Sequence, residues 1–380
     1  MTVLFWTCLG LILFSLVGYG LLWIGLARLV RDRPAHPPVT QSATVLIAAR
    51  NEARDIGAKI RSLRAQRRDG HRVRVLVVSD GSEDATLTEA AAAAEGDADI
   101  QVIGLSQHGG KAAALNHGLA MIPEDEIVIF SDANSLLDPD ALIRLLAPFA
   151  DPGVGGSIGQ LGIKGRDGLM ARAERLYWRY DNALKRAEDR IAGTVSAQGT
   201  LYAVRRGLVG VVPADMADDL AISLGVVARG YRLAYAPGAV AREAVTSNLR
   251  GEFGRRVRST ERGWRGLMHY AGLMNPGRTG LYAVQLFCHK VLRRLVAVLL
   301  PLLLLANVAL LDQGAFYVAM FGAQVALCAV ALAAVTTRWG RRLPGASVAV
   351  LFVMGHAAIF WALLRYAMGV RSTKWAPVRG

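Results

Sequence analysis

The sequence predicts an α/β protein in which a doubly wound, mostly parallel sheet carries transmembrane helices at its N- and C-terminal ends. Between residues 34 and 277, apolar runs rich in β-branched residues alternate with helical stretches, which is typical of βαβ units. The charge-free run 3–27 and three apolar stretches near the end of the chain are each long enough to cross a bilayer. The 380 residues therefore divide into one soluble domain and several membrane helices.

The membrane segments are expected at residues 3–27, 295–311, 315–336 and 346–364. The first is expected to be an anchor and not a secretory signal, because it is too long, no basic segment precedes it and no small-residue cleavage site follows it. Basic residues border three of the segments, which predicts a soluble domain on the cytoplasmic side of the inner (plasma) membrane. These residues are Arg28, Arg31, Arg33, Lys290, Arg293, Arg294, Arg338, Arg341 and Arg342. A fourth complete crossing would place the basic tail outside, so the last segment is left open as tilted or re-entrant.

Within the soluble part, four strand–helix pairs are expected in succession. The strands are 44–49, 73–78, 100–104 and 126–130, and the helices are 52–66, 84–94, 111–121 and 138–149. Further helical stretches are expected at 169–190 and 220–229. The predicted division of the chain is an anchor at 1–30, the soluble domain at 38–245, amphipathic interface helices at 246–292, membrane helices at 293–370 and a basic tail at 371–380.

The net charge and the cysteine content indicate which classes of partner and metal site to expect. The formal net charge is +14, and much of it lies in clusters beside the apolar segments, which favours membrane lipids over nucleic acid. The cysteines Cys8, Cys288 and Cys328 lie in or beside apolar segments and lack metal-site spacing, so neither a disulfide framework nor a zinc site is expected.

Asp132 and Asn134 stand two residues apart, directly after the strand expected at 126–130. A turn there can aim both side-chain oxygens at one Mg2+ or Mn2+ ion that bridges a diphosphate. The alternative is an Asx turn that precedes the next helix and binds no metal. Because ligands of open parallel sheets bind beyond the carboxyl ends of the strands, the position of the pair favours the metal site.

Asp80 and Lys111 are candidates for binding a nucleotide. Asp80 follows the second strand and can accept hydrogen bonds from a base or ribose, with Gly81 allowing close approach of the backbone. Lys111 follows a glycine pair at the start of a helix, where a positive helix end and a point charge suit phosphate. A solvated surface lysine is the alternative. The P-loop pattern GxxxxGK[ST] does not occur, which disfavours a P-loop ATPase.

Asp218 and Asp219 directly precede a helical run. One of two adjacent carboxylates can cap the helix while the other faces the crevice and removes a proton from an acceptor hydroxyl. The alternative is a double cap without a catalytic role. Further along, residues 250–265 are rich in arginine and are expected to lie on anionic lipids, although one or two of the guanidinium groups can clamp a diphosphate. The candidates in this stretch for contact with the diphosphate or the acceptor are Arg255, Arg258, Arg262 and Trp264.

Six segments occur in a specific order: VLIAARNEARDI, VLVVSDGSEDAT, HGGKAAALNHGL, IVIFSDANSLLDPDAL, QGTLYAVRR and ADDLAISLGVVARGYRLAYAPGAV. Together they resemble the membrane-bound family 2 glycosyltransferases, the group that includes cellulose, chitin, hyaluronan and poly-N-acetylglucosamine synthases. The resemblance implies a GT-A-like fold. It also implies an inverting, metal-dependent transfer of sugar from a nucleotide-sugar donor, a UDP-sugar by this likeness, to a lipid or glycan acceptor.

The resemblance also implies roles for individual residues. Asp80 is the uracil-contacting acid, Asp132 with Asn134 the metal motif, and Asp219 the catalytic base. Implied donor-binding residues are Ala49, Asn51, Glu52, Asp80, Lys111, Asn116 and Asp132. Gln198 and Gly199 belong to the implied acceptor-side wall, and Asp218 is a further candidate there.

One departure from the family pattern concerns the acceptor. Processive members carry the motif QxxRW, whereas the matching stretch 255–264 lacks the glutamine and has its tryptophan displaced. Polymer synthesis is thus in doubt, and a lipid acceptor such as a polyprenyl phosphate or a ceramide-like lipid is an equal candidate. The rival to any enzyme is a non-catalytic scaffold or transporter with a nucleotide-binding domain. It leaves the carboxylates unexplained, because transporters place ionisable groups inside their membrane spans.

Overall fold

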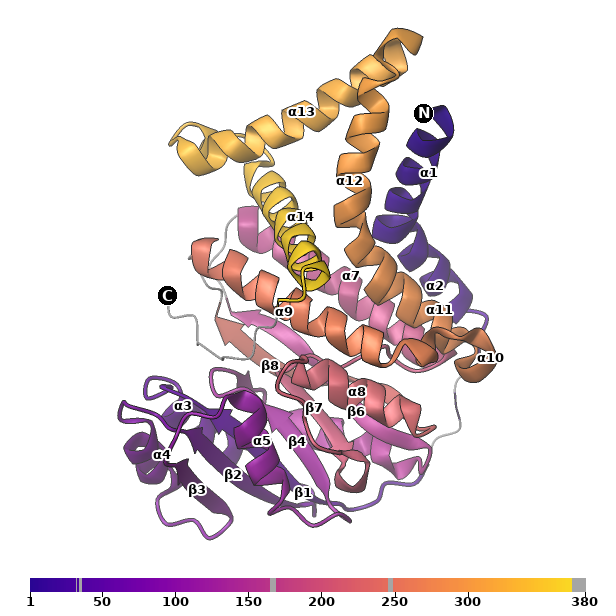
Figure 1. Ribbon diagram of the computed structural model, residues 1–380. Helices are drawn as coiled ribbons and strands as arrows, with labels where there is room; N and C mark the ends of the chain where they lie inside the picture. The colour runs from indigo at the N-terminus through magenta and orange to yellow at the C-terminus, as the bar shows by residue number, and fades with distance from the viewer. Residues whose placement is uncertain (32, 34–35, 165–168, 245–248, 371–380) are drawn as a thin grey trace.

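Figure 1 shows a soluble α/β part and a set of apolar helices, with the two long helices α7 (Leu169–Ile191) and α9 (Leu249–His269) between them. The computed structural model describes residues 1–31, 33, 36–164, 169–244 and 249–370. The predicted basic tail at 371–380 lies outside the described residues.

The soluble part is built on one eight-stranded sheet in the order β3-β2-β1-β4-β7-β6-β8-β5. The first four strands in this order are parallel, β7 runs antiparallel to both of its neighbours, and β6 pairs in parallel with β8. The predicted mostly parallel sheet is therefore confirmed, with a mixed second half. The strands are β1 (Ser42–Ala49), β2 (Arg72–Asp80), β3 (Ile100–Leu105), β4 (Ile127–Ser131), β5 (Leu136–Leu137), β6 (Val154–Lys164), β7 (Leu201–Arg205) and β8 (Arg232–Ala244).

The predicted helices of the soluble part are present, and three of the first four begin a few residues later than expected because a turn separates each strand from its helix. They are α3 (Ile56–Arg64), α4 (Thr86–Ala94), α5 (Lys111–Leu119), α6 (Ala141–Leu146) and α8 (Asp218–Ala228). Short helical turns are η2 (Ala147–Ala150), η3 (Arg206–Leu208), η4 (Ala271–Met274) and α10 (Pro276–Thr279).

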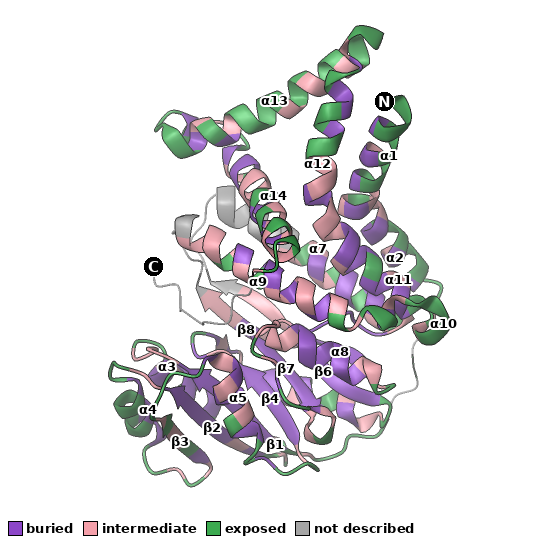
Figure 2. Ribbon diagram, viewed as in Figure 1, coloured by how far each residue is buried: buried purple, intermediate pink, exposed green. Residues whose placement is uncertain are grey.

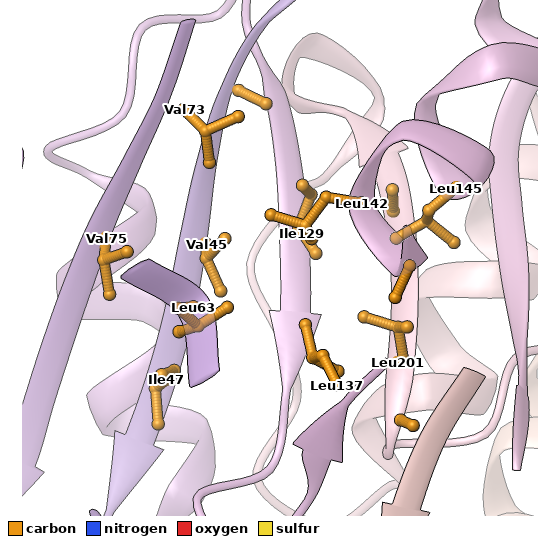
Figure 3. Close-up of a cluster of buried hydrophobic side chains, with 14 of the residues drawn as sticks. Val45, Ile47, Leu63, Val73, Val75, Ile129, Leu137, Leu142, Leu145 and Leu201 are labelled. Carbon is orange, nitrogen blue, oxygen red and sulfur yellow. The ribbon is translucent and has the colours of Figure 1, made fainter. Parts of the chain in front are cut away.

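The core lies on both faces of the sheet, as Figure 2 shows by the buried strands. Side chains alternate along β1: Val45 and Ile47 pack toward α3, α4 and α6, whereas Leu46 and Ala48 pack toward α5 and α8. Figure 3 shows the first of these two layers, in which Ile129 of β4 meets Leu142 of α6. Apolar side chains on both faces fix the strands, so the carboxyl ends of β1, β2 and β4 form a rigid rim.

Within the described residues, four helices are long and apolar enough to cross a membrane: Thr2–Ala27, Leu281–Val308, Ala315–Thr336 and Ala346–Ala367. The first, third and fourth agree with the predicted segments. The second begins well before the predicted residue 295. Hydropathy missed its start because Lys290, Arg293 and Arg294 lie inside the helix and line a cavity against the soluble domain. The constituent elements are α1 (Thr2–Leu13), η1 (Phe14–Gly18), α2 (Tyr19–Ala27), α11 (Leu281–Leu286), η5 (Phe287–Leu292), α12 (Arg293–Val308), η6 (Leu311–Gln313), α13 (Ala315–Thr336), η7 (Gly340–Arg342) and α14 (Ala346–Ala367).

The path of these helices bears on the last predicted segment. In Figure 1 the first helix, α12 and α14 run between the soluble part and the opposite end, whereas α13 runs across the far ends of α12 and α14. The end of α14 lies on α9, where Arg365 Nε donates to Glu261 Oε2 at 3.1 Å. The third basic cluster, in η7, thus lies at the end of α14 away from the soluble part. This differs from the expectation that all three clusters share one side, an expectation that rests on a statistical bias dominated by the first helix.

Candidate active site

The rim of the sheet brings together three residues predicted from separate segments. Lys111, the first residue of α5, places its Nζ atom 2.9 Å from Asp132 Oδ1 and 3.1 Å from Asp218 Oδ2. Asp132 directly follows β4, and Asp218 begins α8. Strand ends and helix starts meet at this edge because the parallel strands run in the same direction. The site is therefore a cation held between two carboxylates.

The charges of this cluster stabilise one another. Burial alone would lower the pKa of Lys111, but the Asp132 and Asp218 carboxylates outweigh it and raise the pKa above its ordinary value. Burial alone would raise the pKa of Asp218, but Lys111 and Arg262 lower it overall. Lys111 and Asp218 therefore stay ionised at neutral pH and present opposite charges to a ligand.

Asp219 behaves differently from its neighbour. Burial and the Asp218 carboxylate raise the pKa of Asp219 to about 6. Its Oδ1 accepts a hydrogen bond from the Leu220 amide at 2.7 Å, so the side chain stays in the first turn of α8. Neither aspartate is the residue that precedes the helix, which is Ala217, so the alternative of a double cap is not the observed arrangement. Two adjacent carboxyls whose pKa values are pushed apart suit an acid–base role for the one with the raised value.

Asp80 is fully buried beneath the loop that leads to α5. Its carboxylate accepts from the Gly109 and Gly110 amides, both at 2.8 Å, and its Oδ2 is hydrogen-bonded to His108 Nδ1 at 2.7 Å. These bonds use three of roughly four acceptor positions of a carboxylate. The observed contacts hold the loop that positions Lys111, and the contact with uracil stays a prediction.

The other implied donor-binding residues make mainly internal contacts. Asn51 has a left-handed φ of 53° and joins the ends of β1 and β2, because its Oδ1 accepts from the Glu83 amide at 2.9 Å. The Ala49 side chain is buried in the core, and the Glu52 amide donates to Thr86 Oγ1 at 2.8 Å. The Asn116 side chain binds both backbone polar groups of Val212, at 2.8 and 3.0 Å. These contacts shape the walls of the site, and a direct contact with a donor stays a prediction for each residue.

The predicted metal pair lies at the same rim. Asn134 is exposed and Asp132 is half-buried, so both can reach a ligand from solvent. Among the described residues, His, Cys, Asp and Glu side chains form no group of three that could hold a metal alone. A Mg2+ or Mn2+ ion in a diphosphate site needs only one or two protein ligands, since phosphate and water oxygens supply the rest. The Lys111 ammonium beside Asp132 shows that this position favours positive charge, so the residues fit a divalent cation.

Lys59 is a site residue that sequence analysis missed. It is fully buried on α3, and its Nζ donates to Ser131 Oγ at 2.6 Å and to Ser135 O at 2.7 Å. Burial lowers the pKa of Lys59 to about 7, although the nearby Asp132 carboxylate opposes the shift. The lysine thereby holds the turn that carries the predicted metal pair. Its position three residues after Ile56, on the apolar face of α3, is the sequence signal that could have found it.

Two adjacent residues separate the rim from a cavity. A Cβ atom on Gly199 would lie 3.3 Å from Asp132 Oδ2 and 3.8 Å from Lys111 Nζ, so the backbone there stands against the charge cluster. Gln198 faces the other way and accepts from Lys185 Nζ at 2.9 Å. It lines a cavity of about 230 Å³ between the soluble part and the membrane helices. Of the two residues of the implied acceptor-side wall, Gly199 therefore faces the charge cluster and Gln198 faces the cavity.

Helix α9 contributes to the site through one of its candidate residues. Arg262 Nε and Nη2 donate to Met216 O at 3.0 and 2.7 Å, which fixes the segment before Asp218. Arg255 is paired with Glu252 at 2.7 Å. Trp264 packs, partly buried, against an apolar cluster that includes Leu220 of α8. Arg258 is half-buried on the same helix. The helix is thus packed between the soluble part and α14 as well as being basic.

Comparisons with known proteins agree with this geometry. The family model described as "Glycosyltransferase like family 2" matches residues 38–263. The poly-beta-1,6-N-acetyl-D-glucosamine synthase of Staphylococcus aureus is 28% identical over 250 residues, which are 64% of this chain and 60% of the relative. An N-acetylglucosaminyltransferase of Azorhizobium caulinodans is 26% identical over 228 residues, 56% of this chain and 57% of that protein. The chain thus matches about 60% of the length of the curated relatives.

A solved structure resembles nearly the whole chain. A mannosyltransferase from Pyrobaculum calidifontis, in complex with GDP-Man and Mn2+, aligns with a TM-score of 0.71 and 24% identity. The alignment covers 96% of this chain and 99% of that protein, membrane helices included. The expected GT-A-like fold is therefore confirmed.

Proposed function

The chain belongs to the family 2 glycosyltransferases, and on that basis we propose that it transfers a sugar from a nucleotide-sugar donor to an acceptor hydroxyl at the membrane. The observation that carries the proposal is the cluster at the rim of the sheet. There Lys111 stands between Asp132 and Asp218, and the adjacent Asp219 has its pKa raised to about 6. The cluster combines a phosphate-binding cation with a carboxyl suited to accept a proton near neutral pH.

In the proposed reaction, the donor diphosphate lies against Lys111 and the positive start of α5. Asp132 and Asn134 would hold Mg2+ or Mn2+, and this ion, when bound, neutralises charge on the leaving diphosphate. Asp219 accepts the proton of the acceptor hydroxyl while the hydroxyl oxygen bonds to the anomeric carbon. The bond from that carbon to the diphosphate breaks, and the electron pair leaves with the nucleotide. Attack from the face opposite the leaving group inverts the anomeric centre.

The donor and acceptor are proposed from the family and from the relatives. Uracil is the base to expect, with Asp80 as its contact once the 108–110 loop adjusts. N-acetylglucosamine is the first sugar to test, because both named relatives carry it in their names. The acceptor is a lipid or a polysaccharide hydroxyl.

The soluble part is proposed to face the cytoplasm, which would place the site at the inner side of the membrane. Three arginines, Arg28, Arg31 and Arg33, follow the first membrane helix on the side of the soluble part. Helix α14 also ends beside α9, so the first helix, α12 and α14 all reach the soluble part. If α13 does not cross the membrane completely, the first helix, α12 and α14 are the crossings, and their odd number accounts for this path.

The proposal is tested with the full chain in neutral detergent, over a panel of UDP- and GDP-sugars with Mn2+ or Mg2+. We expect metal-dependent release of nucleoside diphosphate from one donor when membrane lipids are added as acceptors. Asp132→Ala should reduce the release roughly 1,000-fold, as expected for loss of transition-state charge stabilisation. The matched control is Asp125→Ala, an exposed carboxylate away from the rim. Absence of release, together with absence of a donor-dependent shift in Tm, would favour the scaffold or transporter alternative.

A further inference from the structure

The cavity of about 230 Å³ behind Gln198 contains charges that the proposed donor chemistry does not use. Its walls come from α7, residues 194–198, α9, α14 and the membrane helix Leu281–Val308. That helix contributes a π-helical turn, η5, and the residues that follow it. Irregular turns of this kind are frequent at functional sites.

The acidic residues of the cavity wall already have basic or hydroxyl partners. Asp181 pairs with Lys185 at 2.9 Å. Glu188 is bound by Tyr19 Oη at 2.6 Å and by His289 Nδ1 at 2.7 Å. The Asp181 carboxylate and Glu188 Oε1 are therefore committed to α7, α2 and η5, whereas Glu188 Oε2 has no hydrogen-bond partner among the described residues.

Two cations of the same wall are left over. Among the described residues, neither Lys290 nor Arg294 forms an ion pair, and Arg294 Nη1 donates only to the Lys290 carbonyl, at 2.8 Å. Both belong to a helix long and apolar enough to cross a membrane. A cation inside such a helix is costly unless an anion or an aqueous cavity compensates it. An anionic ligand in the cavity would supply that compensation.

The cavity also presents hydroxyl groups without partners. Thr194 is 1% exposed and Ser196 5% exposed, and within the described part of the chain neither hydroxyl has a hydrogen-bond partner. Buried hydroxyls without partners are costly, so they indicate a polar ligand. Two hydroxyl donors beside two cations are a donor set suited to phosphate oxygens.

The cavity adjoins the carboxyl that the mechanism uses as a base. Burial and Asp218 raise the pKa of Asp219, and the Lys290 ammonium partly opposes them, which means that the two charges interact. A Cβ atom on Gly263 would lie 3.1 Å from Arg294 Nη2 and 3.9 Å from Leu220 Cδ2, so the guanidinium stands beside the residue that follows Asp219. The cavity therefore lies near the start of α8, which carries the base.

We propose that this cavity binds the phosphate group of a lipid acceptor, through Lys290, Arg294, Thr194 and Ser196. This proposal rests on the proposed function, because the hydroxyl of that acceptor is the group that Asp219 deprotonates. The lipid tail leaves the cavity among the membrane helices, while the donor keeps its own cation, Lys111, on the other side of Gly199. A neutral glycan would leave both cations of the cavity unpaired, which is why a phosphate-bearing lipid is favoured.

The test compares lipids that carry a phosphate group with lipids that carry none, using the full chain in neutral detergent. Phosphatidylglycerol is compared with monoglucosyldiacylglycerol, and a polyisoprenyl phosphate with the matching polyisoprenol. Inorganic phosphate is a fifth probe, which separates a lipid-linked phosphate from a free one. Binding is measured by microscale thermophoresis. We expect at least one phosphate lipid to bind roughly 10-fold or more tightly than its neutral counterpart, as one charge-assisted contact provides.

Variants locate the binding in the cavity. Lys290→Gln and Arg294→Gln should each weaken binding of the phosphate lipid roughly 10- to 100-fold. Arg294→Lys should restore much of the affinity, which guards against a variant that merely misfolds. The control is Arg338→Gln, which removes the same charge from an exposed residue next to η7.

Each contrary result has a definite meaning. If both phosphate lipids bind no better than their neutral counterparts, or if inorganic phosphate binds as tightly as either, the proposal is wrong. It is also wrong if Lys290→Gln and Arg294→Gln weaken binding of the nucleotide-sugar instead, because the cavity would then hold the donor. Donor binding is measured on the same samples. If the wild-type protein does not bind the donor, the proposed function is refuted. The lipid comparison would still show whether the cavity binds a lipid phosphate.

Discussion

The rim of the sheet and the cavity beside the membrane helices are neighbouring sites that differ in charge. Carboxylates outnumber the cation at the rim, whereas two cations of the cavity lack carboxylate partners among the described residues. At the rim, Lys111 lies between two carboxylates. In the cavity, Lys290 and Arg294 have no carboxylate partner among the described residues. A cluster that contains charges of both signs suits a ligand that arrives as a metal–diphosphate complex, because that ligand also carries charges of both signs. An unbalanced pair of cations suits a ligand that carries an anion alone.

The two sites also differ in how the chain builds them. The rim is made of loops at strand ends, where Asp132 and Lys111 follow short motifs. The cavity is made of side chains from helices that lie far apart in the sequence. Gln198 and Gly199 are adjacent in the chain, and Gln198 faces the cavity whereas Gly199 faces the rim. Variants at these positions should therefore affect donor and acceptor separately.

The largest effect in this comparison is expected for Lys111→Met. Loss of the ammonium leaves Asp132 and Asp218 facing each other without a cation and removes a phosphate contact. Donor affinity, measured by calorimetry with Mn2+, should fall roughly 100-fold. Binding of a phosphate lipid should stay unchanged, and so should both affinities in Arg67→Met, which removes an exposed surface cation. An equal loss on both sides would show that the two sites are one.

The next largest effects are expected for Gly199→Ala and Gln198→Leu. The first variant should affect the donor and the second the acceptor. The new Cβ of the alanine would press on Asp132 Oδ2, so the KM for the donor should rise roughly 10-fold through misplacement of the cluster. The Gln198→Leu change would remove the bond to Lys185 and should raise the KM for the acceptor by a similar factor. Gly25→Ala, where a Cβ meets open space, is the control for the glycine change. Interchanged effects would contradict the assignment of these two residues.

The smallest effect is expected for Asn134→Asp. An added carboxylate at this exposed position should strengthen binding of the metal, since hard cations prefer charged oxygen ligands. The Mn2+ concentration for half-maximal donor binding should fall by a factor of about 3. No change in that concentration would mean that Asn134 does not contact the ion.

The sequence predicts the rim better than the cavity, and the reasons are physical. Nearly continuous apolar runs in β1 and β2 specify strands that are buried on both faces, and motifs after those strands specify the rim. The second half of the sheet was not predicted in detail, because the insertion of β7 between β4 and β6 depends on long-range pairing. The start of the helix Leu281–Val308 was missed because its polar residues face protein and not water.

Single residues show the same limit of local patterns. The position of Lys59 on the apolar face of α3 indicates burial, but its contact with Ser131 is known only from the fold. Asp80 was correctly placed at the rim, yet its observed partners are the amides of the 108–110 loop. Asn116 is expected to contact the donor, and the observed partner of its amide is the backbone of Val212. Each of these contacts joins residues that are distant in sequence, which spacing along the chain cannot reveal.

The most direct test of the account is the pH dependence of kcat/KM for sugar transfer, in the wild type and in Asp219→Asn. Because protonated Asp219 cannot accept a proton, kcat/KM should fall tenfold per pH unit below about 6 and level off above it. Asp219→Asn should bind the donor normally, transfer roughly 1,000-fold more slowly and lose this dependence. Transfer in Asp219→Asn at the wild-type rate, or a wild-type profile that is flat through pH 6, would contradict the assignment of Asp219 as the base.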